Sequence, residues 1–415
     1  MTAETATGAA LSRQRRLAVV AVLMLTQTYG WGTGLSLLGV LGQPIATDLG
    51  MTPGMVFAAA IVLYGSAAIV APAAGRLADR RGGASLLAPG AAGGALSLLL
   101  LSQAQGPALY FAAWVVHGLA FHFMLLTAAY TAITQIWGPE ARRVIGILTL
   151  ATGLCSTVMW PVTQLLKDQF DWREICLIYA AITAFAVIPL NLALARATSG
   201  LRPAPVPKGE APPAPAPLVG QDKAIFAILA LLFGLSAGIG NSVGILIIDL
   251  YAGMGLDREQ AVYAGSLVGI AFLLARGAEI AFGTRINPAR MSLYVFGALP
   301  LPFVALLGWL VTGETLPPWL AFATALAYGA PQGLAGLMRP ALVQFLFGTR
   351  FFGTMLGRLS RVGDVASAAA PPILATILAT SPLAGLSLIT GMALTCLALV
   401  LLLYRLAGGA NRKEA

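Results

Sequence analysis

Four arginines lie inside apolar stretches long enough to cross a bilayer, and their chemistry is the most specific in the sequence. A charged side chain in hydrocarbon costs several kcal/mol unless it is paired or hydrated, so such residues are functional by default. A guanidinium is permanently charged and planar, and it can hold a carboxylate through two parallel hydrogen bonds. Arg276 and Arg361 are predicted to contact an anionic ligand, whereas Arg358 is predicted to serve a gate or loop and Arg339 to extend toward the interface.

Each of the two predicted anion-binding arginines has an acidic residue three positions later. Glu279 follows Arg276, and Asp364 follows Arg361, so each pair lies on roughly one face of a helix. If the pairs are structural, the two opposite charges of each pair neutralise each other. In a functional reading, a pair that faces a central cavity is a place where a proton or an anion is exchanged.

Two histidines, His117 and His122, lie in one apolar stretch. Histidine titrates near neutral pH and can relay a proton, but a buried histidine is also a common hydrogen-bonded core residue. Because these two are five residues apart, they face different directions and are not expected to share a site.

Four aromatic residues are further candidates to line a substrate cavity, although each can equally serve packing. The glycine-rich spacing around the first two predicts a pliable helix. They are Tyr29, Trp31, Tyr130 and Tyr328.

Composition predicts an all-α integral membrane protein. Of the 415 residues, 58% are hydrophobic and only 10% are charged, so the excess apolar surface must face lipid. The net charge of +9 comes from short basic clusters between apolar stretches, which argues for membrane topology and against nucleic acid as a partner. The three cysteines show no paired or metal-binding spacing. The chain has no phosphate-binding loop and no catalytic arrangement, so neither an enzyme nor a cofactor is predicted.

Twelve apolar stretches have the length of membrane spans, six on each side of a proline-rich interruption. We predict a six-helix bundle over residues 1–196, a cytoplasmic linker over 197–222 and a second six-helix bundle over 223–415. The stretches are 17–41, 55–75, 84–104, 107–136, 143–166, 173–195, 224–250, 259–282, 291–312, 317–346, 351–379 and 382–406.

The distribution of basic residues predicts the orientation. If the N-terminus is cytoplasmic, 18 of the 25 Lys and Arg residues lie in cytoplasmic segments and three in outer loops. We therefore expect a multi-pass monomer in the inner or plasma membrane, with both termini cytoplasmic.

The segment Gly75-Arg76-Leu77-Ala78-Asp79-Arg80-Arg81-Gly82, between the second and third spans, resembles the signature loop of the major facilitator superfamily. The two six-span halves and the long linker are similar to that family over the whole chain. The resemblance implies a gate, for which we select Gly75, Asp79, Arg80 and Arg142. The glycines are expected to permit a tight turn, and Asp79 to hold a helix N-terminus or a nearby arginine. The matching segment of the second half, Gly283–Asn287, has Asn287 where Asp is expected.

Shorter motifs resemble the monocarboxylate and oxalate/formate transporter branch of this superfamily. Trp137-Gly138-Pro139 and the later Arg142 are similar to its Trp-Phe-Pro-x-x-Arg, and Phe170-Asp171-Trp172-Arg173 to its Phe-Gly-Trp-Arg. The branch places a carboxylate-binding arginine in the eighth span, where Arg276 lies one helical turn deeper than usual. The arginine of drug/proton antiporters is absent, because Trp114 stands at its position.

These observations predict a secondary active transporter of a small organic anion, such as a mono- or dicarboxylate, that works by rocking of two halves around a central site. Protonation of Asp364, Glu279 or a histidine would couple transport to protons, and exchange of one anion for another is equally compatible. One alternative is a multidrug or metabolite exporter with a mainly apolar cavity. A second alternative, of another class, is a membrane sensor on the same fold that transports nothing.

Overall fold

The structure is a computed structural model, and it describes residues 12–201, 218–282 and 286–410. These residues form helices joined by short turns, and no strand occurs among them. Most of the proline-rich linker, at 202–217, lies outside the described residues, as do positions 283–285 of the second predicted loop motif.

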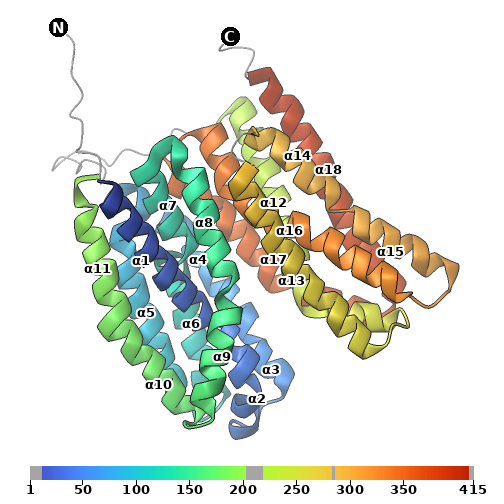
Figure 1. The fold of residues 1–415 in the computed structure, drawn as a ribbon, viewed down its shortest axis with the longest axis horizontal. Helices are drawn as coiled ribbons and strands as arrows, with labels where there is room; N and C mark the ends of the chain where they lie inside the picture. Colours follow the sequence, from blue (N-terminus) through green and yellow to red (C-terminus); the bar gives the residue numbers. More distant parts are fainter. Residues whose placement is uncertain (1–11, 202–217, 283–285, 411–415) are drawn as a thin grey trace. The chain divides into compact units, whose positions relative to one another are not determined.

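Residue contacts divide the chain into two units, which are described separately. Unit 1 comprises Met1–Ala214 with Thr349–Gly357, and unit 2 comprises Pro215–Gly348 with Arg358–Ala415. The helices of unit 1 (Figure 1) are α1 (Arg13–Gly32), η1 (Leu35–Leu37), α2 (Leu38–Asp48), α3 (Pro53–Phe57), α4 (Ala59–Arg81), α5 (Ala84–Ser102), α6 (Pro107–Met124), α7 (Leu126–Trp137), η2 (Gly138–Glu140), α8 (Ala141–Gly153), α9 (Cys155–Lys167), α10 (Trp172–Ile182), the π-helical turn η3 (Thr183–Val187), α11 (Ile188–Ala197) and η4 (Ser199–Leu201).

Unit 2 pairs its helices in the same way as unit 1. In unit 1, α6 packs on α4 and α5, and α11 packs on α1 and α5; in unit 2, α16 packs on α13 and α14, and α18 packs on α12 and α14. This repetition is typical of two bundles built from one structural repeat. The helices of unit 2 are α12 (Gly220–Gly253), α13 (Arg258–Phe282), α14 (Pro288–Ala298), α15 (Leu301–Thr312), α16 (Pro318–Phe347), α17 (Phe352–Thr380), with its first turns in unit 1, and α18 (Pro382–Ala410).

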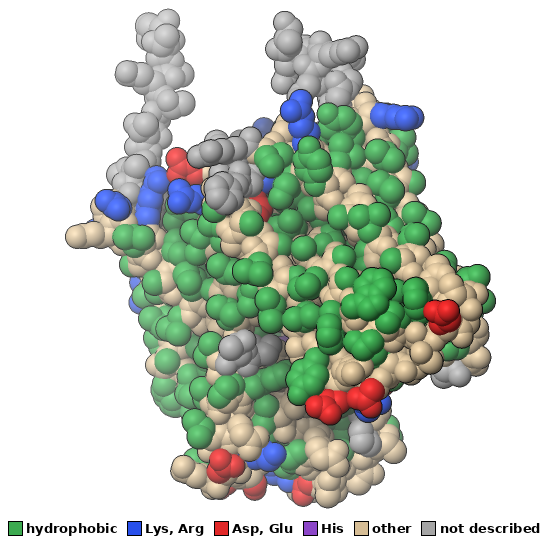
Figure 2. Space-filling model, turned by 45° about the vertical axis from the view of Figure 1, so that its right-hand side comes forward, with side chains coloured by type: hydrophobic (Ala, Val, Ile, Leu, Met, Phe, Trp, Pro, Cys, Tyr) green, Lys and Arg blue, Asp and Glu red, His purple; other side chains and the backbone are tan. Residues whose placement is uncertain are grey.

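Within the described residues, nine helical segments are long and apolar enough to cross a membrane. The remaining three predicted spans correspond to α1, α16 and α17, which have 20, 30 and 29 residues. Large apolar side chains such as Phe185 and Ile69 are exposed, as expected where lipid replaces water. In Figure 2, hydrophobic side chains cover most of the middle of the face in view, and most of the charged side chains lie above or below them.

Several predicted continuous spans are broken, which corrects the sequence interpretation; the span at 291–312, for example, is interrupted between Ala298 of α14 and Leu301 of α15. The span at 17–41 ends as a helix at Gly32, the span at 107–136 breaks at Leu125, and the span at 143–166 breaks at Leu154. The backbone of Leu125 leaves helical geometry at φ −116° and ψ −143°. A hydropathy pattern cannot reveal such a break because the apolar residues continue through it.

The broken helices of unit 1 adjoin one another and satisfy part of the exposed backbone. The Gln27 side-chain nitrogen donates to the Met124 carbonyl at 2.8 Å, directly before the break at Leu125. A Cβ on Gly30 would lie 2.9 Å from the Leu125 side chain, and Ser36 Oγ lies 3.8 Å from Cys155 Sγ. Inside a bilayer, free backbone groups need such protein partners because no water is available.

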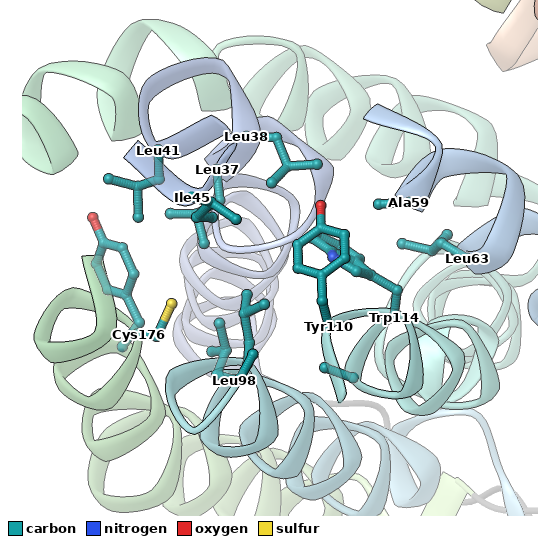
Figure 3. Close-up of a cluster of buried hydrophobic side chains, with 14 of the residues drawn as sticks. Leu37, Leu38, Leu41, Ile45, Ala59, Leu63, Leu98, Tyr110, Trp114 and Cys176 are labelled. Atoms are coloured by element: carbon teal, nitrogen blue, oxygen red, sulfur yellow. The ribbon is translucent and has the colours of Figure 1, made fainter. Parts of the chain in front are cut away.

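A cluster of buried side chains holds η1 and α2 against the neighbouring helices of unit 1 (Figure 3). In this cluster, Leu38 lies near Tyr110, and Leu41 and Ile45 lie on the side of Cys176. The Tyr110 hydroxyl donates to the Val56 carbonyl at 2.7 Å, so this large aromatic residue is buried without losing its hydrogen bond. The cluster anchors the short helices that follow the break after α1.

Close contact between α4 and α6 depends on Gly118. A Cβ at this position would overlap the Leu63 carbonyl oxygen and lie 2.8 Å from Ser66 Cβ. We expect Gly118→Ala to lower the apparent melting temperature in detergent, because overpacking of a tight contact costs roughly 1–3 kcal/mol. The control is Gly65→Ala on α4, where a Cβ meets nothing within 4 Å. Equal melting temperatures for both variants would contradict the tight contact.

The motif that begins at Gly75 is helical rather than a loop, which is a second correction. Helix α4 continues through Arg81, and the chain turns only at Gly82, with φ of +86°. Gly75 therefore does not serve the predicted turn. A Cβ on Gly75 would overlap the Gly353 carbonyl oxygen, so its role is to let α4 approach the first turn of α17.

Candidate functional site

Arg276 lies within unit 2 on α13, and its side chain is 7% exposed. Its Nε–H donates to the Gly333 carbonyl of α16 at 2.8 Å. The guanidinium carbon lies 4.2 Å from the centre of the Phe272 ring, at cation–π distance. These two contacts fix the orientation of the guanidinium plane.

Small residues on α16 make room for this arginine. A Cβ on Gly333 would lie 2.7 Å from the Phe272 carbonyl oxygen, and one on Gly336 would lie 3.3 Å from an Arg276 terminal nitrogen. Helices α13 and α16 therefore approach at backbone distance, as glycine-containing membrane helices do. This close approach brings the Gly333 carbonyl within hydrogen-bond distance of the Arg276 side chain.

The acidic residues three positions after the predicted arginines are both buried in unit 2. Glu279 is 2% exposed and Asp364 is 6% exposed. Arg361 is exposed, so the two members of the Arg361–Asp364 pair lie in different surroundings. Arg358 is partly buried.

Arg339 of α16 is a candidate that sequence reasoning assigned only to the interface. It is partly buried, and its Nε is buried without a hydrogen-bond partner among the described residues. A Cβ on Gly363 of α17 would lie 3.6 Å from an Arg339 terminal nitrogen, so the guanidinium packs on the α17 backbone beside Asp364. No local sequence pattern indicates this contact, because Gly363 lies on another helix.

A polar contact joins α12 to α17 in the same unit. The Asn241 side-chain nitrogen donates to Ser367 Oγ at 2.9 Å and to the Ala237 carbonyl at 3.0 Å. Ser367 lies three residues after Asp364. Partly buried hydrogen bonds of this kind favour one rotation of α17, because an unpaired amide in hydrocarbon is costly.

In unit 1, the Tyr29 hydroxyl joins a hydrogen-bonded cluster. It donates to the Tyr179 carbonyl at 2.6 Å and accepts from Thr183 Oγ1 at 3.3 Å. The Tyr179 hydroxyl lies 2.7 Å from Thr163 Oγ1. Tyr29 therefore connects α1 to α10 within the bundle.

His117 and Tyr29 line the same small cavity of unit 1. Its volume is about 20 Å³, close to the space for one water molecule, and Thr26, Thr33 and Asn191 also line it. His117 is 2% exposed, and a Cβ on Gly34 would lie 3.2 Å from its Nε2. The cavity thus brings His117 together with hydroxyl and amide groups that can share a water with it.

The second histidine has a different role, because it lies across a helix break. His122 Nδ1 lies 2.8 Å from Thr127 Oγ1, on the two sides of Leu125. The structure does not bring His122 together with His117 at the cavity. This agrees with their five-residue spacing.

The other predicted aromatic residues are packed inside their units. Trp31 lies edge-to-face with Phe121, with ring centres 5.6 Å apart. Tyr130 is 2% exposed, and Tyr328 is 3% exposed with its ring 5.4 Å from that of Phe303. The Tyr328 hydroxyl is buried without a hydrogen-bond partner among the described residues.

Asp79 of α4 binds the N-terminus of α17, whose first turn belongs to unit 1. Its carboxylate accepts from the backbone N–H of Gly353 at 2.7 Å and of Thr354 at 2.6 Å, and also from the Thr354 hydroxyl. Orphan N–H groups and the helix dipole make such a terminus a good partner for a carboxylate. Arg80 is exposed and Arg142 is half-buried.

No group of three or more His, Cys, Asp or Glu side chains suited to a metal ion occurs in the described ranges.

Residues 17–371 match the family model of the Major Facilitator Superfamily. The fold and this match, which covers most of the chain, define the class: the chain belongs to the major facilitator superfamily. It is a multi-pass membrane transporter rather than an enzyme.

Two known proteins are similar to the chain. The crystal structure of the human organic anion transporter MFSD10 (TETRAN) matches with a TM-score of 0.66 and 19% identity, covering 94% of this chain and 100% of that one. At this identity the likeness concerns the fold. An uncharacterized 38 kDa protein in the 23S RNA operon of Thermoproteus tenax is 30% identical over 137 residues, which is 32% of this chain and 36% of that protein. The chain thus spans about a third of the length of that relative.

Proposed function

We propose that the protein is a secondary active transporter of a small organic anion, a mono- or dicarboxylate, and that it works by alternating access. The observation that carries the proposal is Arg276, a guanidinium buried in a membrane helix and oriented by the Gly333 carbonyl. A buried charge in a membrane helix is expensive, and a fixed planar cation is the group best suited to a carboxylate.

Two more arginines of unit 2 support an anion as the substrate. Arg339 packs against the α17 backbone at Gly363, and Arg361 is exposed on α17. The name of MFSD10 as an organic anion transporter agrees with this substrate class. Four aromatic residues remain proposed to line the cavity: Tyr29, Trp31, Tyr130 and Tyr328. Because their side chains are packed inside the bundles, they are proposed to shape the cavity by holding the helices in place.

Proton coupling is assigned to the buried carboxyl groups Glu279 and Asp364 and to His117 at its small cavity. Exchange of one anion for another is the alternative source of energy. The proposal includes bundles at 1–196 and 223–415, the linker at 197–222, and a monomer in the inner or plasma membrane with cytoplasmic termini.

Reconstituted protein should take up radiolabelled mono- or dicarboxylates into liposomes with saturation kinetics, because a fixed cationic site binds the anion. Protein-free liposomes are the control. An inward proton gradient that increases uptake indicates symport, whereas a requirement for internal anion indicates exchange. The same anions should raise the apparent melting temperature of the purified protein.

Other outcomes of this assay separate the alternatives. Flux of hydrophobic cations with none of carboxylates would support the exporter and contradict the anion proposal. A ligand that raises the melting temperature without any flux would support a sensor.

A further inference from the structure

An open groove runs between α1 and α11 of unit 1, and none of the residues assigned to transport lines it. Its volume is about 690 Å³. It is lined mainly by apolar and small side chains, with one arginine from each helix; the residues that matter here are Arg15, Ala18, Val22, Leu190, Ala193 and Arg196. We name it the α1–α11 groove.

The two arginines lie at one end of this groove. Arg15 is in the first turn of α1 and Arg196 in the last turn of α11, and both are exposed. Neither guanidinium has an ion pair or hydrogen bond with another described residue, whereas the adjacent Arg16 pairs with Glu140 at 3.7 Å. Among the described residues, the lining contains no acidic side chain, so the two arginines give this end of the groove a positive charge.

The rest of the groove is apolar along the helix axes. From Arg15 to Val22, α1 rises about 10 Å, and Ala18 leaves the space open over this length. On α11, Ala193 and Leu190 continue the same surface. A cationic end followed by an apolar channel matches an amphiphile with an anionic head and a hydrocarbon chain.

We propose that the α1–α11 groove binds an anionic phospholipid, with its phosphate at Arg15 and Arg196 and an acyl chain along Ala18, Val22 and Ala193. Arginine pairs bind phosphate through parallel charge-assisted hydrogen bonds. Basic pockets between membrane helices at the headgroup level recognise anionic lipids for this reason. The site is separate from Arg276, so lipid binding does not depend on the proposed transport function.

The test is native mass spectrometry of the full-length protein in detergent, titrated with phosphatidylglycerol and, in parallel, phosphatidylcholine. The parent should bind phosphatidylglycerol more tightly. The double variant Arg15→Gln/Arg196→Gln should lose about tenfold in phosphatidylglycerol affinity, since each basic residue near a membrane surface contributes to anionic lipid binding. The matched control Arg13→Gln/Arg405→Gln removes the same charge from exposed helix ends outside the groove and should retain binding.

A second variant tests the apolar part without changing charge. Ala193 is exposed, so Ala193→Trp should fill the groove without disturbing the bundle, and it should lower phosphatidylglycerol affinity at an unchanged melting temperature. Equal affinity of the parent for the two lipids would overturn the proposal, leaving an apolar groove without headgroup recognition. Equal losses in the groove and control variants would also overturn it, in favour of general charge attraction.

Discussion

Arg276→Lys is expected to reduce carboxylate uptake by about tenfold or more at subsaturating substrate, since a loss of ~1.4 kcal/mol in binding is a factor of ten. Lysine keeps the positive charge but lacks the planar fork that donates to the Gly333 carbonyl and to a ligand at once. It also loses the stacking of the guanidinium on Phe272. The measurement is initial uptake in proteoliposomes over a range of carboxylate concentrations.

Two further measurements separate a binding role from a structural one. If Arg276 binds substrate, the lysine variant should melt close to the parent but lose the ligand-induced rise in melting temperature. If it only joins α13 to α16, the melting temperature itself should fall. The matched control is Arg258→Lys, an exposed arginine at the start of α13, which should transport normally. Normal uptake by Arg276→Lys would rule out the proposed site.

Asp79→Asn is expected to slow transport by about tenfold or more, because hydrogen bonds to a charged group contribute roughly 1.5–3 kcal/mol each. The carboxylate holds two backbone N–H groups and a hydroxyl at the first turn of α17. Asparagine keeps one acceptor oxygen and loses the attraction of its charge for the helix dipole. Maximal uptake rate should fall more than ligand affinity, since Asp79 is proposed to bias the gate and not to bind substrate.

A graded series makes this assignment specific. Thr354→Val removes only the hydroxyl contact, so its effect should lie between that of the parent and that of Asp79→Asn. Arg76→Gln alters an exposed residue of the same helix, three positions earlier, and should leave transport unchanged. The gate assignment fails if Arg76→Gln is as harmful as Asp79→Asn, or if Asp79→Asn transports at the parent rate.

Membrane class and family could be predicted because hydropathy and loop charge are local properties of the chain. The span at 84–104, for example, corresponds to α5 at Ala84–Ser102, since a bilayer requires about twenty apolar residues in a helix. The short motif around Asp79 pointed to the superfamily that the match over residues 17–371 shows.

Several site features could not be predicted because they depend on contacts distant in the chain. The partner of Asp79 is 274 residues away, and Arg276 meets a carbonyl 57 residues away. The break at Leu125 is equally invisible, since leucine continues the apolar pattern while Gln27 of another helix binds the carbonyl next to the break. The packing of Arg339 on Gly363 is a contact between two helices, so the sequence alone could not show it. For that reason Arg339 was predicted to extend toward the interface.

The sequence by itself determined that this is a helical membrane protein of the facilitator type, with arginines inside its spans. That follows from the free-energy cost of placing charged side chains and unpaired backbone groups in lipid. This cost depends on the residues of each segment and not on its neighbours in the fold. Only the tertiary structure decided which guanidinium is buried and oriented, where the predicted spans break, and what Asp79 holds. Those properties depend on close backbone approach at glycines such as Gly75 and Gly333, and the partner at each position is supplied by a distant helix.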